Sequence, residues 1–187
     1  MAYEIELIEP GAGTAEQNAF LERVPPINLF KALAHAPEIA NAVAQMGGAL
    51  LYKTGLDAGL REVAILRAAY QAGCDYEVAH HERIALDVGL DEETLAAIRP
   101  GQDLSGLSAG MGLACRWADE AVASGRAGQH LVEEAIAMFG KAQTIELAVT
   151  VAYYLMVASL LVTFEVPLEA EGFEGGVKIN EVPDTLD

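Results

Sequence analysis

The chain has 187 residues, of which 52% are hydrophobic and only 6% aromatic, and its formal net charge is −17. A chain of this length can bury a core as one domain without the support of disulfides. The acidic charge argues against nucleic acid as a partner, because most of the surface would repel a polyanion. Two cysteines form no disulfide framework, and the start MAYEIELIEP lacks a signal-peptide pattern, so we expect a cytoplasmic protein.

Abundant Ala and Leu, without runs of alternating Val, Ile and Thr, favour helices over strands. We predict an all-α protein with one helical domain at residues 25–167. A leader with a short helix (1–24) precedes it, and an acidic tail (168–187) follows. Residues 58–72 and 75–88 should form a central helical hairpin, separated at Gly73. Further helices are predicted over residues 14–23, 28–35, 37–54, 92–99, 107–123, 129–139 and 142–164.

A weak internal repeat suggests that the domain consists of two related helical halves. In each matched pair, the first residue lies in the hairpin and the second lies in the last predicted helix. The pairs are Ala58 and Ala142, Glu62 and Glu146, Ala64 and Ala148, Ala68 and Ala152, and Tyr70 and Tyr154.

The segment at residues 147–164 carries no charge and is nearly long enough to cross a membrane. Tyr153 and Tyr154 fall at its centre rather than at its ends, and Glu146 and Glu165 flank it, which is not the pattern of a spanning helix. We therefore expect no membrane association, and a helix that is buried on all sides, in the core or at a subunit interface.

The sequence of the second hairpin helix, GCDYEVAHHERIA, places two polar side chains on an apolar face. At helical spacing, Glu77 and His81 share one stripe with Cys74, Ile84 and Val88. A carboxylate and an imidazole four residues apart are neighbours that can hydrogen-bond each other. A structural hydrogen-bond pair would show the same pattern.

The first hairpin helix has a similar anomaly, because Glu62 lies among apolar residues. Burying an unpaired carboxylate is costly, so we expect the hairpin to bring Glu62 beside His81 and Glu77. Such a buried cluster would contain an acid, a base and an orienting group. Arg61 and Arg67 should lie on the sides of this helix as solvated charges. Either could nevertheless hold a substrate carboxylate at a subunit junction.

The run LREVAILRAAYQAGCDYEVAHHERIALDVGLDEE resembles the core of the carboxymuconolactone decarboxylase and AhpD-like superfamily. Glu62, Cys74 and His81 match the AhpD-type motif, but Tyr76 replaces a His and Glu77 replaces the second Cys of its C-x-x-C. The form found here is more similar to the decarboxylase-like branch. The resemblance implies an AhpD-like helical bundle that assembles as a homo-oligomer, a trimer or a hexamer.

By this resemblance, the chain is expected to be a cofactor-independent lyase of aromatic compound catabolism, acting on a small cyclic or unsaturated carboxylic acid or lactone. His81, Glu77 and Glu62 would be the catalytic residues. Substrate-binding residues would be Cys74, Tyr76 and Arg67. Two alternatives stay open: a peroxidase that uses Cys74 with an external thiol or Cys115, and a non-catalytic helical assembly or binding protein.

A metal site is the less favoured interpretation of the same residues. Glu77 has the spacing of a ligand pair with either His80 or His81. A di-iron bundle needs a second Glu-x-x-His, which the sequence lacks. A mononuclear site built from Glu62, Glu77 and His81 remains an alternative, but we expect no metal and no cofactor.

Overall fold

The computed structural model describes residues 4–170, and within this range the secondary structure is entirely helical, which confirms the all-α prediction. The chain divides into two compact units. One is Thr54–Ser159, and the other combines Met1–Lys53 with Leu160–Asp187. Most of the predicted tail at 168–187 lies outside the described residues.

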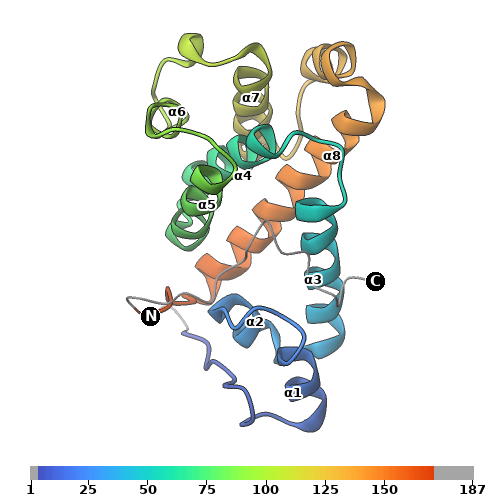
Figure 1. The fold of residues 1–187 in the computed structure, drawn as a ribbon, viewed down its shortest axis with the longest axis vertical. Helices are drawn as coiled ribbons and strands as arrows, with labels where there is room; N and C mark the ends of the chain where they lie inside the picture. Colours follow the sequence, from blue (N-terminus) through green and yellow to red (C-terminus); the bar gives the residue numbers. More distant parts are fainter. Residues whose placement is uncertain (1–3, 171–187) are drawn as a thin grey trace. The chain divides into compact units, whose positions relative to one another are not determined.

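The Thr54–Ser159 unit contains the predicted hairpin and the helices that follow it. In Figure 1, α4 lies between α5 and α7, the two helices with which it makes its main contacts. The elements are α4 (Ala58–Ala72), α5 (Asp75–Asp87), α6 (Glu92–Ala97), a 3₁₀ turn (Leu104–Gly106), α7 (Ala109–Ser124) and α8 (Gln129–Thr163), which extends past the end of the unit.

Helix ends fall where the sequence places caps and glycines. Asp57 begins α4 by accepting a hydrogen bond from the backbone N–H of Leu60 at 2.9 Å. Gly73 ends α4 in the left-handed conformation, with φ of 65°, and allows the immediate turn into α5. Gly140, with φ of 80°, interrupts α8, so the two helices predicted on either side of it are confirmed.

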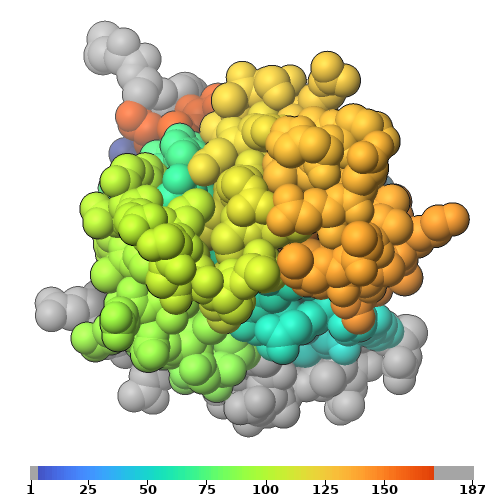
Figure 2. Space-filling model, turned by 90° about the horizontal axis from the view of Figure 1, so that it is seen from above, coloured from blue at the N-terminus to red at the C-terminus, as the bar shows by residue number. Residues whose placement is uncertain are grey.

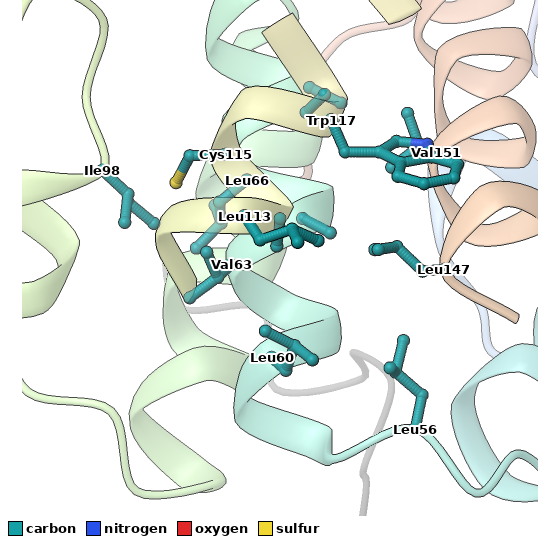
Figure 3. Packing of buried hydrophobic residues seen from close by; sticks show 14 of the residues in the cluster. Leu56, Leu60, Val63, Leu66, Ile98, Leu113, Cys115, Trp117, Leu147 and Val151 are labelled. Carbon is teal, nitrogen blue, oxygen red and sulfur yellow. The ribbon is translucent and has the colours of Figure 1, made fainter. Parts of the chain in front are cut away.

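The core of this unit forms where α4, α7 and α8 meet. Figure 3 shows Leu66, Leu113 and Leu147 pointing toward one another from these three helices, and all three are fully buried. Figure 2 shows the first segment of α8 beside α7 at the surface. Burial of one large aliphatic side chain stabilises a fold by about 1.5 to 3 kcal/mol. The cluster therefore stabilises the position of α4, the first helix of the hairpin.

The other unit contains three helices, α1 (Ala15–Leu21), α2 (Asn28–Leu33) and α3 (Pro37–Tyr52). Thr14 and Gln17 form a capping box at the start of α1. A separate small core includes Phe20 and Phe30, whose rings meet edge to face with centroids 6.0 Å apart. No predicted site residue belongs to this unit.

Within one chain, residues 147–164 are not buried on all sides, and burial of the remaining face at a subunit interface stays a prediction. By length and composition, α8 is the one helix in residues 4–170 that could cross a bilayer, yet only 44% of its most apolar window is buried. Ile145 is 64% exposed and Met156 48%, whereas Tyr153 and Tyr154 on the other face are buried. One face of the helix is therefore buried and the other is exposed. Both faces are largely apolar, which is why the sequence suggested complete burial.

Candidate active site

The α4–α5 hairpin brings Glu62 and His81 into direct contact inside the Thr54–Ser159 unit. Nδ1 of His81 lies 2.6 Å from Oε2 of Glu62. Glu62 is fully buried and His81 is 7% exposed. A carboxylate oxygen accepts hydrogen bonds, so the tautomer that suits this contact has its hydrogen on Nδ1, which donates a hydrogen bond to Glu62. The sequence-based expectation that the hairpin joins these two side chains therefore agrees with the geometry.

Arg61 supplies the second contact of the Glu62 carboxylate. Its Nε donates to Oε1 of Glu62 at 3.1 Å, and its side chain is also buried. The expectation that Arg61 is a solvated charge is wrong, because the carboxylate next to it in the chain draws it inward. Glu62 thus bridges a guanidinium and an imidazole, which satisfies both of its oxygens.

Glu77 lies on the buried face of α5 but does not bond to His81 as predicted. The ring's bond goes to Glu62 instead, and Oε2 of Glu77 has no hydrogen-bond partner among residues 4–170. Burial raises the pKa of Glu77 well above its usual range, because the charged form would lose its hydration. Burial of Glu77 therefore favours its neutral, protonated form.

Two tyrosines of α8 complete the surroundings of His81. The ring of Tyr154 meets the imidazole edge to face, with centroids 4.8 Å apart, and Tyr153 meets Tyr154 in the same way at 5.1 Å. Burial raises the pKa of both hydroxyls, so both stay protonated. Neither tyrosine was predicted from the sequence to belong to the site. Their place opposite the hairpin depends on the packing of α8, which local sequence does not reveal.

Cys74, expected to line the site, is buried at the start of α5. Burial raises the pKa of its thiol to about 11, and it does the same for Cys115. Both cysteines are free thiols. Because only a thiolate attacks peroxide efficiently, neither side chain has the electrostatic environment of a reactive cysteine.

Tyr76, the second residue expected to bind substrate, is also buried. Its ring stacks on that of His80, with centroids 4.7 Å apart and 24° between the planes. His80 is only partly exposed. No role in binding follows from this stacking, and the assignment of Tyr76 stays a prediction.

Arg67, the third expected substrate ligand, is committed to the fold instead. Its Nε and Nη2 donate to the two oxygens of Asp119 at 2.6 and 2.8 Å. Its Nη1 donates to the backbone carbonyls of Ile98 and Arg99 at 3.0 and 2.8 Å. The pKa of Arg67 is raised, chiefly by the bond to Asp119. The predicted solvation of Arg67 is therefore wrong, because the side chain is buried, and its predicted contact with substrate stays a prediction.

A polar cluster outside the buried site fixes the hairpin. Glu82 of α5 accepts hydrogen bonds from the hydroxyl of Tyr70 on α4 and from Nη2 of Arg99, both at 2.6 Å. The guanidinium of Arg99 lies over the ring of Tyr70, 4.9 Å from its centroid. These contacts hold α4 and α5 in the register that joins Glu62 to His81.

The chemistry of the buried cluster does not favour a cation. Within residues 4–170, no group of three or more His, Cys, Asp and Glu side chains is placed to hold a metal ion. Arg61 already supplies positive charge to Glu62, and Glu77 is neutral. The mononuclear site considered from the sequence therefore lacks the ligand arrangement that it requires.

Comparison with known proteins places the hairpin within a described family. Residues 37–120 match the model of the carboxymuconolactone decarboxylase family. A solved structure of a protein of unknown function from Agrobacterium tumefaciens, suggested to be an antioxidant defence protein AhpD, has a similar fold. Its TM-score is 0.67 at 19% identity over 74% of this chain and 96% of that one, a level of identity that shows the fold alone. No curated protein matches the sequence.

Proposed function

We propose that this chain, which belongs to the carboxymuconolactone decarboxylase and AhpD-like superfamily, is a cofactor-independent lyase that acts by proton transfer on a small cyclic or unsaturated carboxylic acid or lactone. The observation that carries the proposal is the buried 2.6 Å bond between Nδ1 of His81 and Glu62. A carboxylate in this position fixes the imidazole tautomer and stabilises its protonated form, which is what an acid–base catalyst requires.

His81 is proposed to exchange the proton through Nε2. With Nδ1 donating to Glu62, Nε2 is the ring nitrogen without a hydrogen bond to any described residue. In the proposed decarboxylation, the C–C bond to the substrate carboxylate breaks, carbon dioxide leaves, and the electron pair of that bond moves into the conjugated carbonyl group. Nε2 in its protonated form then gives its proton to carbon, and solvent restores the proton on Nε2.

Glu77 is proposed to stabilise the oxyanion that forms on the substrate carbonyl. A neutral carboxylic acid can donate an O–H hydrogen bond, whereas a carboxylate in the same place would repel the developing charge. Its unpartnered Oε2 and its raised pKa support this role. Charge stabilisation of this kind acts most strongly in a site from which water is excluded.

Peroxidase activity is the less supported alternative. Glu77 stands where the AhpD-type motif has its second cysteine, so Cys74 has no vicinal thiol. Its raised pKa leaves very little thiolate at neutral pH. A non-catalytic role for the cluster is distinguished from the lyase by the experiment that follows.

The test is release of carbon dioxide from a panel of unsaturated lactone carboxylic acids. Wild-type protein should release it from at least one member, and His81→Gln should lower kcat by about 10² to 10⁴-fold. His130→Gln serves as the matched control, because His130 is exposed and pairs only with Glu120. Equal activity of the two variants, or no turnover of any acid by wild-type protein, would contradict the proposal.

We also propose that the chain self-associates through the exposed face of α8. Five exposed residues recur there at alternating spacings of four and three, which is the seam of two packed helices: Ile145, Val149, Ala152, Met156 and Ser159. In an antiparallel pair with two-fold symmetry, Ile145 would face the small Ser159 and Val149 would face Met156. Ala152 would lie on the axis and permit close approach.

The charge distribution favours a second copy of the chain as the occupant of this face. Two molecules that each carry a net charge of −17 repel each other, but no charged residue lies between Glu146 and Glu165. The α8 face is therefore a place where identical copies can meet without juxtaposing like charges. Association through it would also hold the opposite face, with Tyr153 and Tyr154, firmly in place.

A further inference from the structure

Arg61 carries a buried hydrogen-bond donor that the protein leaves unused. Nε of its guanidinium bonds to Glu62, but Nη2 is buried and has no hydrogen-bond partner among residues 4–170. The side chain is 3% exposed, so water does not readily replace the missing acceptor. Arginine cannot shed its charge to relieve the burial, and buried donors are almost always paired. An oxygen atom of a ligand would therefore satisfy the unpaired Nη2 as its hydrogen-bond acceptor.

A second unpartnered group accompanies Nη2 in the same region. Oε2 of Glu77 is likewise buried without a hydrogen-bond partner among the described residues, and burial raises the pKa of its carboxyl group, which favours the protonated form. Arg61 and Glu77 both act electrostatically on Tyr154, whose ring contacts His81. Arg61 is linked to the histidine through Glu62, which bonds to both side chains, and Glu77 shares the buried face of α5 with His81. The region of the histidine thus contains two polar groups whose hydrogen-bonding capacity the described residues leave unused.

We propose that Nη2 of Arg61 binds the carboxylate of a small monoanionic acid and positions it against His81. A planar carboxylate fits the planar guanidinium better than a spherical anion does. Glu62 already neutralises part of the charge of Arg61, so a doubly charged anion such as phosphate would meet repulsion from Glu62. This inference rests on the proposed function and assigns the substrate class of its site.

The experiment measures calorimetrically the binding of crotonate, a four-carbon unsaturated monocarboxylate, to the full chain. Crotonamide, which has the same shape without the charge, and inorganic phosphate are measured alongside. Wild-type protein should bind crotonate at least about tenfold more tightly than either. Equal binding of crotonate and crotonamide would overturn the inference without the need for any variant.

Variants then locate the binding group. Arg61→Lys keeps the positive charge but removes the Nη2 position, so crotonate affinity should fall by at least about tenfold while crotonamide affinity stays unchanged. Arg83→Gln is the control for a general effect of surface charge, because Arg83 is exposed on α5 and its replacement removes one positive charge. Wild-type affinity in Arg61→Lys, or an equal loss in Arg83→Gln, would overturn the assignment of Arg61.

The outcome separates this inference from the lyase proposal. If crotonate binds through Arg61 but no acid loses carbon dioxide, the carboxylate site stands and the lyase proposal fails. If an acid is decarboxylated and Arg61→Lys leaves KM unchanged, the lyase proposal stands and the carboxylate site is wrong.

Discussion

Burial in the folded protein favours the protonated form of Glu77, and this should have a measurable effect on stability. Its pKa is raised by burial in the folded state, whereas in the unfolded chain it ionises near pH 4.5. The protonated group's contribution to stability is therefore complete below about pH 4.5 and is lost as the pH rises through the folded-state pKa. The position therefore destabilises the fold at neutral pH, which is a combination common in active sites if Glu77 has the role proposed for it.

Glu77→Gln should remove this dependence on pH, because glutamine has a similar shape and cannot ionise. The variant should match wild type near pH 4.5 and become progressively more stable above it. The difference should grow by up to about 1.4 kcal/mol per pH unit until the folded-state pKa is passed. Urea unfolding at pH 4.5, 6.0 and 7.5 measures this, and parallel stability profiles for the two proteins would show that Glu77 is not protonated in the fold.

The two thiols should be unreactive in the folded protein. The pKa of each is raised from 9.0 to about 11, which lowers the thiolate fraction about 100-fold relative to a free cysteine. Alkylation by iodoacetamide at pH 7.5, followed by mass spectrometry, should therefore be slow for both until urea is added. Rapid modification of native Cys74 would instead favour the peroxidase alternative.

Single residues also show where reasoning from sequence stops. The buried stripe of α5 was predictable because Glu77 and His81 share a helical face with Ile84 and Ala85, and all four are buried. The burial of Arg61 and Arg67 was not predictable, because each depends on a carboxylate partner. For Arg67 that partner is Asp119, which is far away in the sequence and is brought near only by the packing of α7 on α4.

The ion pair between Arg67 and Asp119 links α4 to α7 and should stabilise the fold. Asp119→Ala would leave the buried guanidinium of Arg67 without its carboxylate and should cost about 3 kcal/mol of unfolding free energy. Glu134→Ala is the matched control, since it breaks the exposed Arg116–Glu134 ion pair and should cost less than about 1 kcal/mol. Urea unfolding compares the two, and similar costs would mean that Arg67 finds another partner or water.

Helix positions were largely predictable, and the environment of α8 was not. Caps and glycines such as Asp57, Gly73 and Gly140 act through local backbone chemistry, so they mark boundaries in the sequence itself. Whether an apolar helix is covered on every side depends on how many neighbours reach it. The sequence of α8 could not distinguish full burial from one buried and one exposed apolar face. The weak internal repeat stays a prediction.

The chain as a whole should associate through α8 if the exposed seam is an interface. Met156→Glu places a charge within the seam and should shift the protein to monomer, as measured by light scattering after size-exclusion chromatography. Leu86→Glu is the matched control, because Leu86 is also an exposed apolar residue but lies on α5. Association should strengthen with salt, which screens the repulsion between acidic copies.

Three results would contradict association through this seam. Wild-type protein could be monomeric at all concentrations, the two variants could dissociate equally, or wild-type protein could bind neutral phosphatidylcholine vesicles in place of a second copy. In the last case the apolar face of α8 would be a lipid contact rather than a protein interface.

The central claim is that Glu62 and His81 act as one proton-transfer unit, and a double-mutant cycle on kcat tests it most directly. His81→Gln, Glu62→Gln and the double variant are compared on the acid that wild-type protein turns over fastest. Because the carboxylate acts only through the imidazole, the double variant should lose no more activity than His81→Gln alone. A fold loss of kcat in the double variant equal to the product of the two single losses would contradict this claim.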